Sequence, residues 1–164
     1  MHTIIDYLLA NGADLALEIN PAETLVFAPW TIMKCLYGCP NYGHNRACPP
    51  ISPGYEQTKE IASSFGRGVI FRVHKIEEGT PLALAAAAEL FKTGFYKALA
   101  FGTGPCRQCE KCLGLECPTP HLSAPSMEAC GIDVFATLER AGIDYKPFNK
   151  PTEHIDCFGL LLID

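Results

Sequence analysis

The stretch from Gly68 to Gly94, GVIFRVHKIEEGTPLALAAAAELFKTG, contains a strand pattern followed by a helix pattern. Residues Gly68–His74 are rich in β-branched and aromatic side chains, which is typical of a β-strand. Thr80-Pro81 predicts a helix N-cap followed by proline at the first helical position. Leu82–Thr93 is rich in alanine and leucine, and Gly94 is placed to end the helix. This unit predicts a domain built from both strands and helices.

Similar patterns extend in both directions from this unit. Before it we expect a helix at residues 2–11, strands at Leu15–Ile19 and Leu25–Phe27, and a helix at residues 54–65. After it we expect a strand at Ala98–Phe101, a helix within residues 126–141 with Asp133 capping its second half, and a buried strand at Ile155–Ile163. The alternation predicts an α/β or α+β fold, a single domain over residues 1–164 with a central sheet of about four or five strands flanked by helices.

Composition and charge disfavour several classes of protein. The 164 residues are 48% hydrophobic and 19% charged, with a formal net charge of −5 at pH 7. This is enough apolar material for a core, and the acidic balance disfavours binding to nucleic acid or to an anionic membrane. The longest apolar runs are far shorter than the roughly 20 residues of a membrane span, and the first residues lack the features of a signal peptide. We therefore expect a cytoplasmic protein.

Cysteine is the residue type that departs from an ordinary composition, with nine in the chain. Seven of them fall in two segments rich in glycine and proline, residues 35–50 and 102–121, which we expect to form irregular loops at one end of the sheet. A reducing cytoplasm disfavours disulfides, whereas closely spaced thiolates are typical ligands of a soft metal or an iron–sulfur cluster. The candidate ligands are Cys35, Cys39, Cys48, Cys106, Cys109, Cys112 and Cys117.

The second segment carries the more specific spacing. Its pattern, Cys106-x2-Cys109-x2-Cys112-x4-Cys117-Pro118, is similar to the C-x2-C-x2-C-x3-C-P run of bacterial ferredoxins, apart from a last gap of four residues. The four thiolates could instead form a tetrahedral zinc site, with His121 as a further candidate ligand. The triple spacing favours a cluster, because zinc sites usually use well-separated C-x2-C pairs. Zinc nevertheless remains an alternative to a cluster in this segment.

The first segment, Cys35-x3-Cys39-x8-Cys48, is looser. Three thiolates can bind three irons of a 4Fe–4S cluster, which leaves the fourth iron for an exogenous ligand, for Cys117 or for His44. If Cys117 serves the first segment, Cys130 or Cys157 becomes a candidate fourth ligand for the second. Otherwise the apolar surroundings of Cys130 and Cys157 favour core packing.

Three functions are compatible with these patterns. The first is an iron–sulfur protein with one or two 4Fe–4S clusters that passes single electrons between larger redox partners. The second is an enzyme whose open-site cluster acts as a Lewis acid or a sulfur acceptor. The third is a zinc-stabilised structural or interaction module. The sequence contains no Walker-type phosphate loop, dinucleotide fingerprint or G-x-S-x-G elbow, and leaves both enzymatic activity and oligomeric state open.

Several motifs together resemble a known family. They are CPNYGHNRACPP at residues 39–50, GPCRQCEKC at 104–112, Cys117-Pro118, and PSMEACGIDV at 125–134. The combination is similar to a family of cysteine-rich, predicted metal-binding proteins catalogued as domain of unknown function 2284, found largely in anaerobic bacteria and archaea. The resemblance runs from about Cys35 to the final strand. It implies metal or iron–sulfur binding in anaerobic metabolism by the seven loop cysteines, without a requirement for cysteine at positions 130 or 157, and it supplies no reaction.

Overall fold

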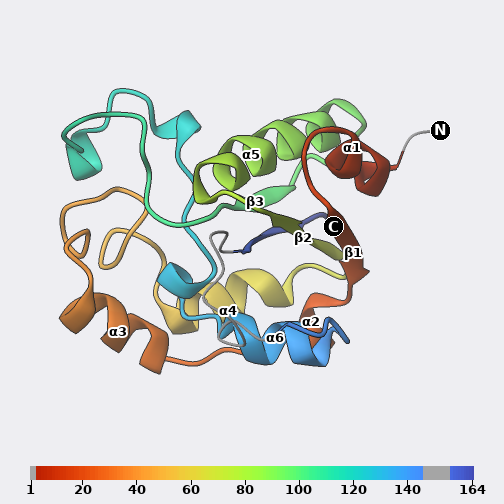
Figure 1. Ribbon diagram of the computed structural model, residues 1–164, viewed down its shortest axis with the longest axis horizontal. Helices are drawn as coiled ribbons and strands as arrows, with labels where there is room; N and C mark the ends of the chain where they lie inside the picture. The colour runs from red at the N-terminus through yellow and green to blue at the C-terminus, as the bar shows by residue number, and fades with distance from the viewer. Residues whose placement is uncertain (1–2, 146–155) are drawn as a thin grey trace.

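A four-stranded antiparallel sheet forms the middle layer of the molecule (Figure 1). Its strands are β1 (Leu15–Ile19), β2 (Gly68–Val73), β3 (Leu99–Phe101) and β4 (Cys157–Leu162), and they lie in the order β1-β2-β4-β3. The computed structural model describes residues 3–145 and 156–164. Its mixture of helices around a sheet of four strands confirms the predicted fold class.

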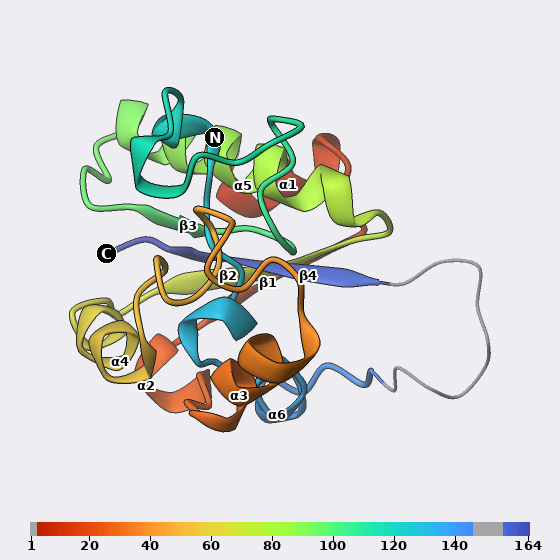
Figure 2. The same cartoon turned by 90° about the vertical axis from the view of Figure 1, so that its left-hand side faces the viewer.

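Helices cover both faces of the sheet (Figure 2). On one face lie α1 (Ile4–Ala10) and α5 (Ile76–Lys92), and on the other lie α2 (Pro21–Thr24), α3 (Trp30–Gly38), α4 (Tyr55–Ser63) and α6 (Val134–Arg140). The chain between β3 and α6 adds three short 3-10 helices, η1 (Gly114–Glu116), η2 (Pro120–Leu122) and η3 (Glu128–Cys130). Within the described residues, none of the helices is both long enough and apolar enough to cross a membrane.

The inner strands β2 and β4 are apolar along nearly their whole length because helices cover both of their faces. Val69 and Phe71 of β2 belong to the core cluster shared with α5, whereas Ile70 belongs to the cluster on the opposite face. On β4, Leu161 and Leu160 divide between the two clusters in the same way. The alternation follows the two-residue period of a strand, so one sheet supports two separate cores.

A close approach between β2 and β4 explains the glycine within an otherwise apolar strand. Gly159 lies directly opposite Phe71 in the ladder. A Cβ at Gly159 would lie 2.3 Å from Cζ of Phe71, and the Phe71 side chain is fully buried, with 0% of its surface exposed. Glycine therefore provides the space that this ring fills in the core.

The predicted strand at Leu25–Phe27 is wrong. Asn20 and Pro21 instead begin the short helix α2, and the Asn20 side chain accepts a hydrogen bond from a backbone N–H at 3.1 Å. A capping residue followed by proline favours a helical turn over an extended strand. Phe27 then forms only an isolated bridge with Ile132.

The predicted start of the long helix at Thr80-Pro81 is also wrong, because α5 begins at Ile76 and contains Pro81. Thr103, from the chain beyond β3, supports the early turn. Its hydroxyl donates a hydrogen bond to the Ile76 carbonyl at 2.6 Å, and it packs so close to Gly79 that a Cβ there would lie 2.3 Å from the Thr103 Oγ1. This long-range contact favours a helical turn that the local sequence did not indicate.

Helix α3 corrects the expectation of irregular backbone from Cys35 onward. The helix runs from Trp30 to Gly38 and includes Cys35. The glycines and prolines that indicated irregular structure begin only at Gly38, after several residues compatible with a helix. Beyond Cys39, the chain to residue 54 contains turns and bends but no helix or strand.

Near the carboxyl end, the predicted helix within residues 126–141 divides into η3 and α6. Gly131 separates them with a left-handed backbone, at φ 83°. Asp133 caps α6 as predicted, because its Oδ1 accepts a hydrogen bond from the Ala136 N–H at 3.1 Å. The final strand begins at Cys157, and Ile155 lies outside the described residues.

Candidate metal centre

The first cysteine segment folds back on itself at the end of α3. Cys35 lies in the last turns of the helix, and the backbone N–H of Cys39 donates to the Cys35 carbonyl at 3.2 Å. The chain then turns at Gly43, where φ is 75°, and the Gly43 N–H donates to the Pro49 carbonyl at 2.8 Å. This closure brings Cys48 back toward the other two thiols of the segment.

The second segment, residues 102–121, lies beside the first on the same side of the molecule (Figure 1). Its thiols differ in exposure, as do those of the first segment. Cys48 is buried, Cys39 and Cys109 are exposed, and the other four are intermediate: Cys35, Cys106, Cys112 and Cys117. Within the described residues, none of these seven cysteines forms a disulfide, so their thiols are available to a metal.

Asn45 joins the two segments. Its Nδ2 donates to the Cys106 carbonyl at 2.8 Å, and its Oδ1 accepts from the Cys106 N–H at 3.1 Å. The same oxygen accepts from the Ala47 N–H at 3.0 Å. Asn45 is 5% exposed, so these bonds are shielded from water and hold the two backbones together.

Arg46 adds a second link beside it. Its backbone N–H donates to the Cys112 sulfur at 3.2 Å, and its Nη1 donates to the Gly114 carbonyl at 3.4 Å. Hydrogen bonds to cluster sulfurs tune the reduction potential of iron–sulfur proteins. The Arg46 N–H is thus placed to donate to the Cys112 sulfur if that sulfur binds a cluster.

Four thiols from the two segments act electrostatically on a fifth, Cys48. Burial, followed by the nearby Cys39, Cys35, Cys112 and Cys106, raises the pKa of Cys48 to about 11. Thiolates gathered in this way repel one another unless a cation lies among them. A thiolate-ligated metal or cluster would supply that positive charge, so the donor chemistry of this region fits such a group.

The described geometry does not form a finished coordination site. Among residues 3–145 and 156–164, no three His, Cys, Asp or Glu side chains lie close enough to hold one metal ion. Cys109 and Cys117 are not among the thiols that perturb Cys48, and His44 and His121 are exposed on their loops.

The two remaining cysteines contribute to apolar packing. Cys130 is 0% exposed in the core, and burial raises the pKa of its thiol to about 12 despite a hydrogen bond with Thr58. Cys157 begins β4 and packs against the core cluster between the sheet and α5, and burial raises the pKa of its thiol as well. That Cys130 or Cys157 acts as a fourth metal ligand for the second segment stays a prediction.

Cys35 and Cys39 also line a pocket of about 300 Å³. The pocket lies between α3, η3 and the start of α6, and Trp30 and Phe135 contribute aromatic surface to it. Glu128 lines the same pocket. Two candidate metal ligands thus lie at the edge of a cavity that is large enough for a small organic molecule.

Glu128 was not among the candidates from the sequence. Burial raises the pKa of its carboxyl, against hydrogen bonds with its own backbone and with Ser126, while other parts of the residue are exposed to solvent. Its charge raises the pKa values of Cys35, Cys130 and Cys157. Its place in the PSMEACGIDV motif was a signal, but a linear motif does not show that Glu128 shares a pocket with the end of α3.

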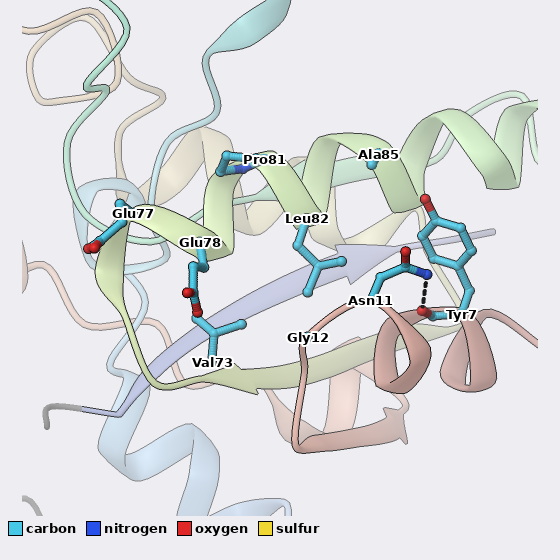
Figure 3. A pocket seen from close by; sticks show the side chains of 9 residues that line it. All are labelled: Tyr7, Asn11, Gly12, Val73, Glu77, Glu78, Pro81, Leu82 and Ala85. Carbon is cyan, nitrogen blue, oxygen red and sulfur yellow. Dashed lines mark hydrogen bonds between the residues drawn. The ribbon is translucent and has the colours of Figure 1, made fainter.

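A second hollow, of about 540 Å³, lies between α1 and α5 on the other face of the sheet (Figure 3). The Asn11 Nδ2 donates to the Tyr7 carbonyl at 2.8 Å, and Glu77 and Glu78 lie at the opposite end of the hollow. Its nine lining residues include neither cysteine nor histidine. This hollow is therefore separate from the candidate metal centre.

Comparison with known proteins agrees with these features. A family model described as "Predicted metal-binding protein (DUF2284)" matches residues 18–163, a range that contains both cysteine segments and the pocket. No curated protein and no solved structure shows significant similarity to the chain. Because the family model covers most of its length, the chain belongs to the DUF2284 family of predicted metal-binding proteins.

Proposed function

We propose that the protein binds one or two 4Fe–4S clusters through its two cysteine segments and passes single electrons between larger redox partners in anaerobic metabolism. The observation that carries this proposal is the gathering of thiols from both segments around Cys48. A cluster held there supplies one-electron redox chemistry. The candidate ligands are the seven loop cysteines: Cys35, Cys39, Cys48, Cys106, Cys109, Cys112 and Cys117.

The spacing and the local hydrogen bonding support iron and sulfide over zinc. Three thiols within residues 106–112 follow the ferredoxin spacing, which suits a cubane better than a tetrahedral ion. The Arg46 N–H donates to the Cys112 sulfur, as backbone amides commonly do around iron–sulfur clusters. Links between Asn45 and Cys106 keep the two segments in one unit that a cluster could bridge.

A second candidate function is favoured by the pocket at Cys35 and Cys39. If the first segment holds three irons of a cluster, the fourth iron is open to a small molecule. Such a site could serve non-redox chemistry, with iron as a Lewis acid or a sulfur acceptor. This alternative needs a pocket beside the cluster, whereas simple electron transfer does not.

Metal analysis of anaerobically purified protein tests the proposal. Iron, acid-labile sulfide and zinc per chain are measured together with the absorption spectrum. About eight irons and eight sulfides support two clusters, and about four of each support one. Reversible one-electron reduction in a redox titration supports electron transfer. Zinc without sulfide, in protein never exposed to air, would overturn the iron–sulfur proposal in favour of a zinc-stabilised module.

Single substitutions then locate the ligands. Cys106→Ser and Cys112→Ser are expected to lower iron and sulfide per chain, because serine is a poorer ligand for iron–sulfur clusters. Cys157→Ala is compared with them, because Cys157 packs beside α5 outside both segments and is an alternative ligand, not one of the seven. Equal iron content in all three variants would contradict the assignment of the second segment. A shift of the absorption spectrum on addition of cyanide would favour the second candidate function, in which one iron is open to a small molecule.

A further inference from the structure

Aromatic side chains surround the pocket beside Cys35 and Cys39 without being covered by the fold. Trp30 from α3 is 45% exposed, and Phe135 from α6 is 48% exposed. A neighbouring hollow of about 630 Å³ shares both residues and is lined by further residues of α6 and of the chain that follows it. Partly uncovered aromatic walls of a concave site are suited to the apolar body of a small ligand.

A positive charge stands at one side of this pocket. Lys34, one turn along α3 from Trp30, lines the cavity, and its Nζ lies 5.0 Å from the centroid of the Trp30 ring. Within the described residues, Lys34 has no ion-pair partner among the carboxylates. Its ammonium group is therefore held near the aromatic wall and is available to the carboxylate of a ligand.

Two carboxyl groups line the same pocket. Glu128 comes from η3, and Asp133 precedes α6. The Asp133 Oδ1 accepts the capping hydrogen bond from the Ala136 N–H, which leaves its other oxygen for a further donor. Asp133 provides an acceptor for the ammonium group of a ligand, and Glu128 lines the same pocket with a carboxyl that also forms hydrogen bonds with its own backbone and with Ser126.

The combination distinguishes between classes of ligand. A simple organic anion would be attracted by Lys34 but repelled by Glu128 and Asp133. A simple amine would be attracted by the two carboxylates but repelled by Lys34. A molecule with both charges and an apolar body matches all three features. We propose that this pocket binds a free α-amino acid with an apolar side chain, most favourably an aromatic one. This inference goes beyond the proposed electron-transfer function and does not depend on which metal the thiols hold.

The chain contains a built-in probe for this site, because Trp30 is its single tryptophan. The experiment adds L-phenylalanine to the purified holoprotein and follows tryptophan fluorescence, with isothermal titration calorimetry as a second readout. We expect saturable binding with a Kd below about 1 mM. 3-Phenylpropanoate lacks the ammonium group and 2-phenylethylamine lacks the carboxylate, so each is expected to bind about tenfold more weakly or worse.

Variants show whether the named side chains carry the binding. Lys34→Gln and Glu128→Gln are each expected to weaken L-phenylalanine binding about tenfold, because each removes one charge–charge contact and keeps a polar side chain. Lys59→Gln is the matched control, since Lys59 is an exposed lysine of α4 that does not line the pocket. It is expected to bind as the wild type does.

Two results would overturn the inference. One is an absence of binding to L-phenylalanine by both readouts in folded protein. The other is equal affinity for L-phenylalanine and 3-phenylpropanoate, or unchanged affinity in Lys34→Gln, which would show that the paired charges are not recognised. Iron and sulfide are counted on the same preparation. Amino acid binding by protein that contains zinc and no sulfide would support the binding pocket and refute the iron–sulfur cluster. Protein that contains a cluster but binds no amino acid would support the cluster and refute the binding pocket.

Discussion

Asn45 and Cys106 are joined by two reciprocal hydrogen bonds, although they are 61 positions apart in the chain. The Asn45 Nδ2 donates to the Cys106 carbonyl at 2.8 Å, and the Cys106 N–H donates to the Asn45 Oδ1 at 3.1 Å. A side-chain amide that satisfies both backbone groups of one residue fixes that residue in position and orientation. The thiols of the two segments consequently share one environment.

Replacement of this amide is expected to separate the segments. Asn45→Ala leaves the partly buried Cys106 backbone groups without their partners, so the free energy of unfolding should fall by about 2 kcal/mol and iron content should fall with it. Urea denaturation and metal analysis check both effects. Asn11→Ala is the control, because its amide makes one local bond, to the Tyr7 carbonyl at the end of α1. Wild-type metal content in Asn45→Ala would show that the segments do not depend on this link.

Gly131 is expected to be intolerant of a side chain for two separate reasons. Its φ is 83°, and a Cβ there would lie 2.8 Å from both Cα and Cβ of Tyr55. Gly131→Ala should lower the free energy of unfolding by about 3 kcal/mol, because the backbone of α4 would have to move. Gly142 also has a positive φ, of 75°, but a Cβ there would have no neighbour within 4 Å. Gly142→Ala should therefore lower the free energy of unfolding by the conformational strain alone, about 1 kcal/mol. Equal losses of unfolding free energy in the two variants would refute the steric argument for Gly131.

The ion pair between Asp14 and Arg72 is expected to give a pH-dependent contribution to stability. Its closest atoms, Asp14 Oδ2 and Arg72 Nη2, are 2.6 Å apart, and the hydrogen bond from Arg72 lowers the pKa of the Asp14 carboxyl. A carboxyl whose pKa is lower in the folded state stabilises the fold above its unfolded value of about 3.9, and this contribution is lost as pH falls through the folded pKa.

The variant Asp14→Asn tests this contribution. The difference in unfolding free energy from the wild type is expected to be about 1 kcal/mol at pH 7, since the pair is partly exposed, and to shrink below about pH 4. Urea denaturation at several pH values measures it. Glu56→Gln, a change in the first turn of α4, serves as the control. A difference that stays constant from pH 7 to pH 3 would exclude the ion pair as its cause.

Cysteine reactivity is expected to follow burial in metal-free protein. Cys39 and Cys109 are exposed, whereas Cys130 is 0% exposed and its pKa is raised to about 12 by burial. Because the thiolate is the reactive form, iodoacetamide at pH 7.5 should label Cys39 and Cys109 first and Cys130 only after unfolding. Mass spectrometry of the digested protein gives the order. Labelling of Cys130 as fast as Cys109 would contradict the packing described here.

Several elements could be predicted from the sequence because their signals are local. The strands at residues 15–19 and 68–73 were indicated by strand propensity, and Asp133 was recognised as a helix cap from its position alone. The start of α5 could not be predicted in this way. It depends on Thr103, which supports the Ile76 turn from a distant part of the chain.

The same distinction applies to the candidate metal centre. Cysteine spacing along the chain pointed to thiolate chemistry, because ligands that bind one metal or cluster are often close in sequence. It did not indicate that α3 extends through Cys35, nor that Asn45 would join the two segments. Glu128 was missed because its environment is formed by α3, which follows from packing and not from its neighbours in sequence.

The sequence by itself determined a mixed fold of helices and a central sheet. It also determined that seven of the nine cysteines fall in two groups, each with short spacings along the chain. Periodicity, capping residues and ligand spacing act over a few residues, so they can be recognised without a structure. Only the tertiary structure decided that thiols of both groups lie near enough to Cys48 to raise its pKa and that Lys34 and Glu128 share one pocket. These relationships depend on how distant segments pack, because a contact between them is stabilised only once the sheet and its covering helices have brought them together.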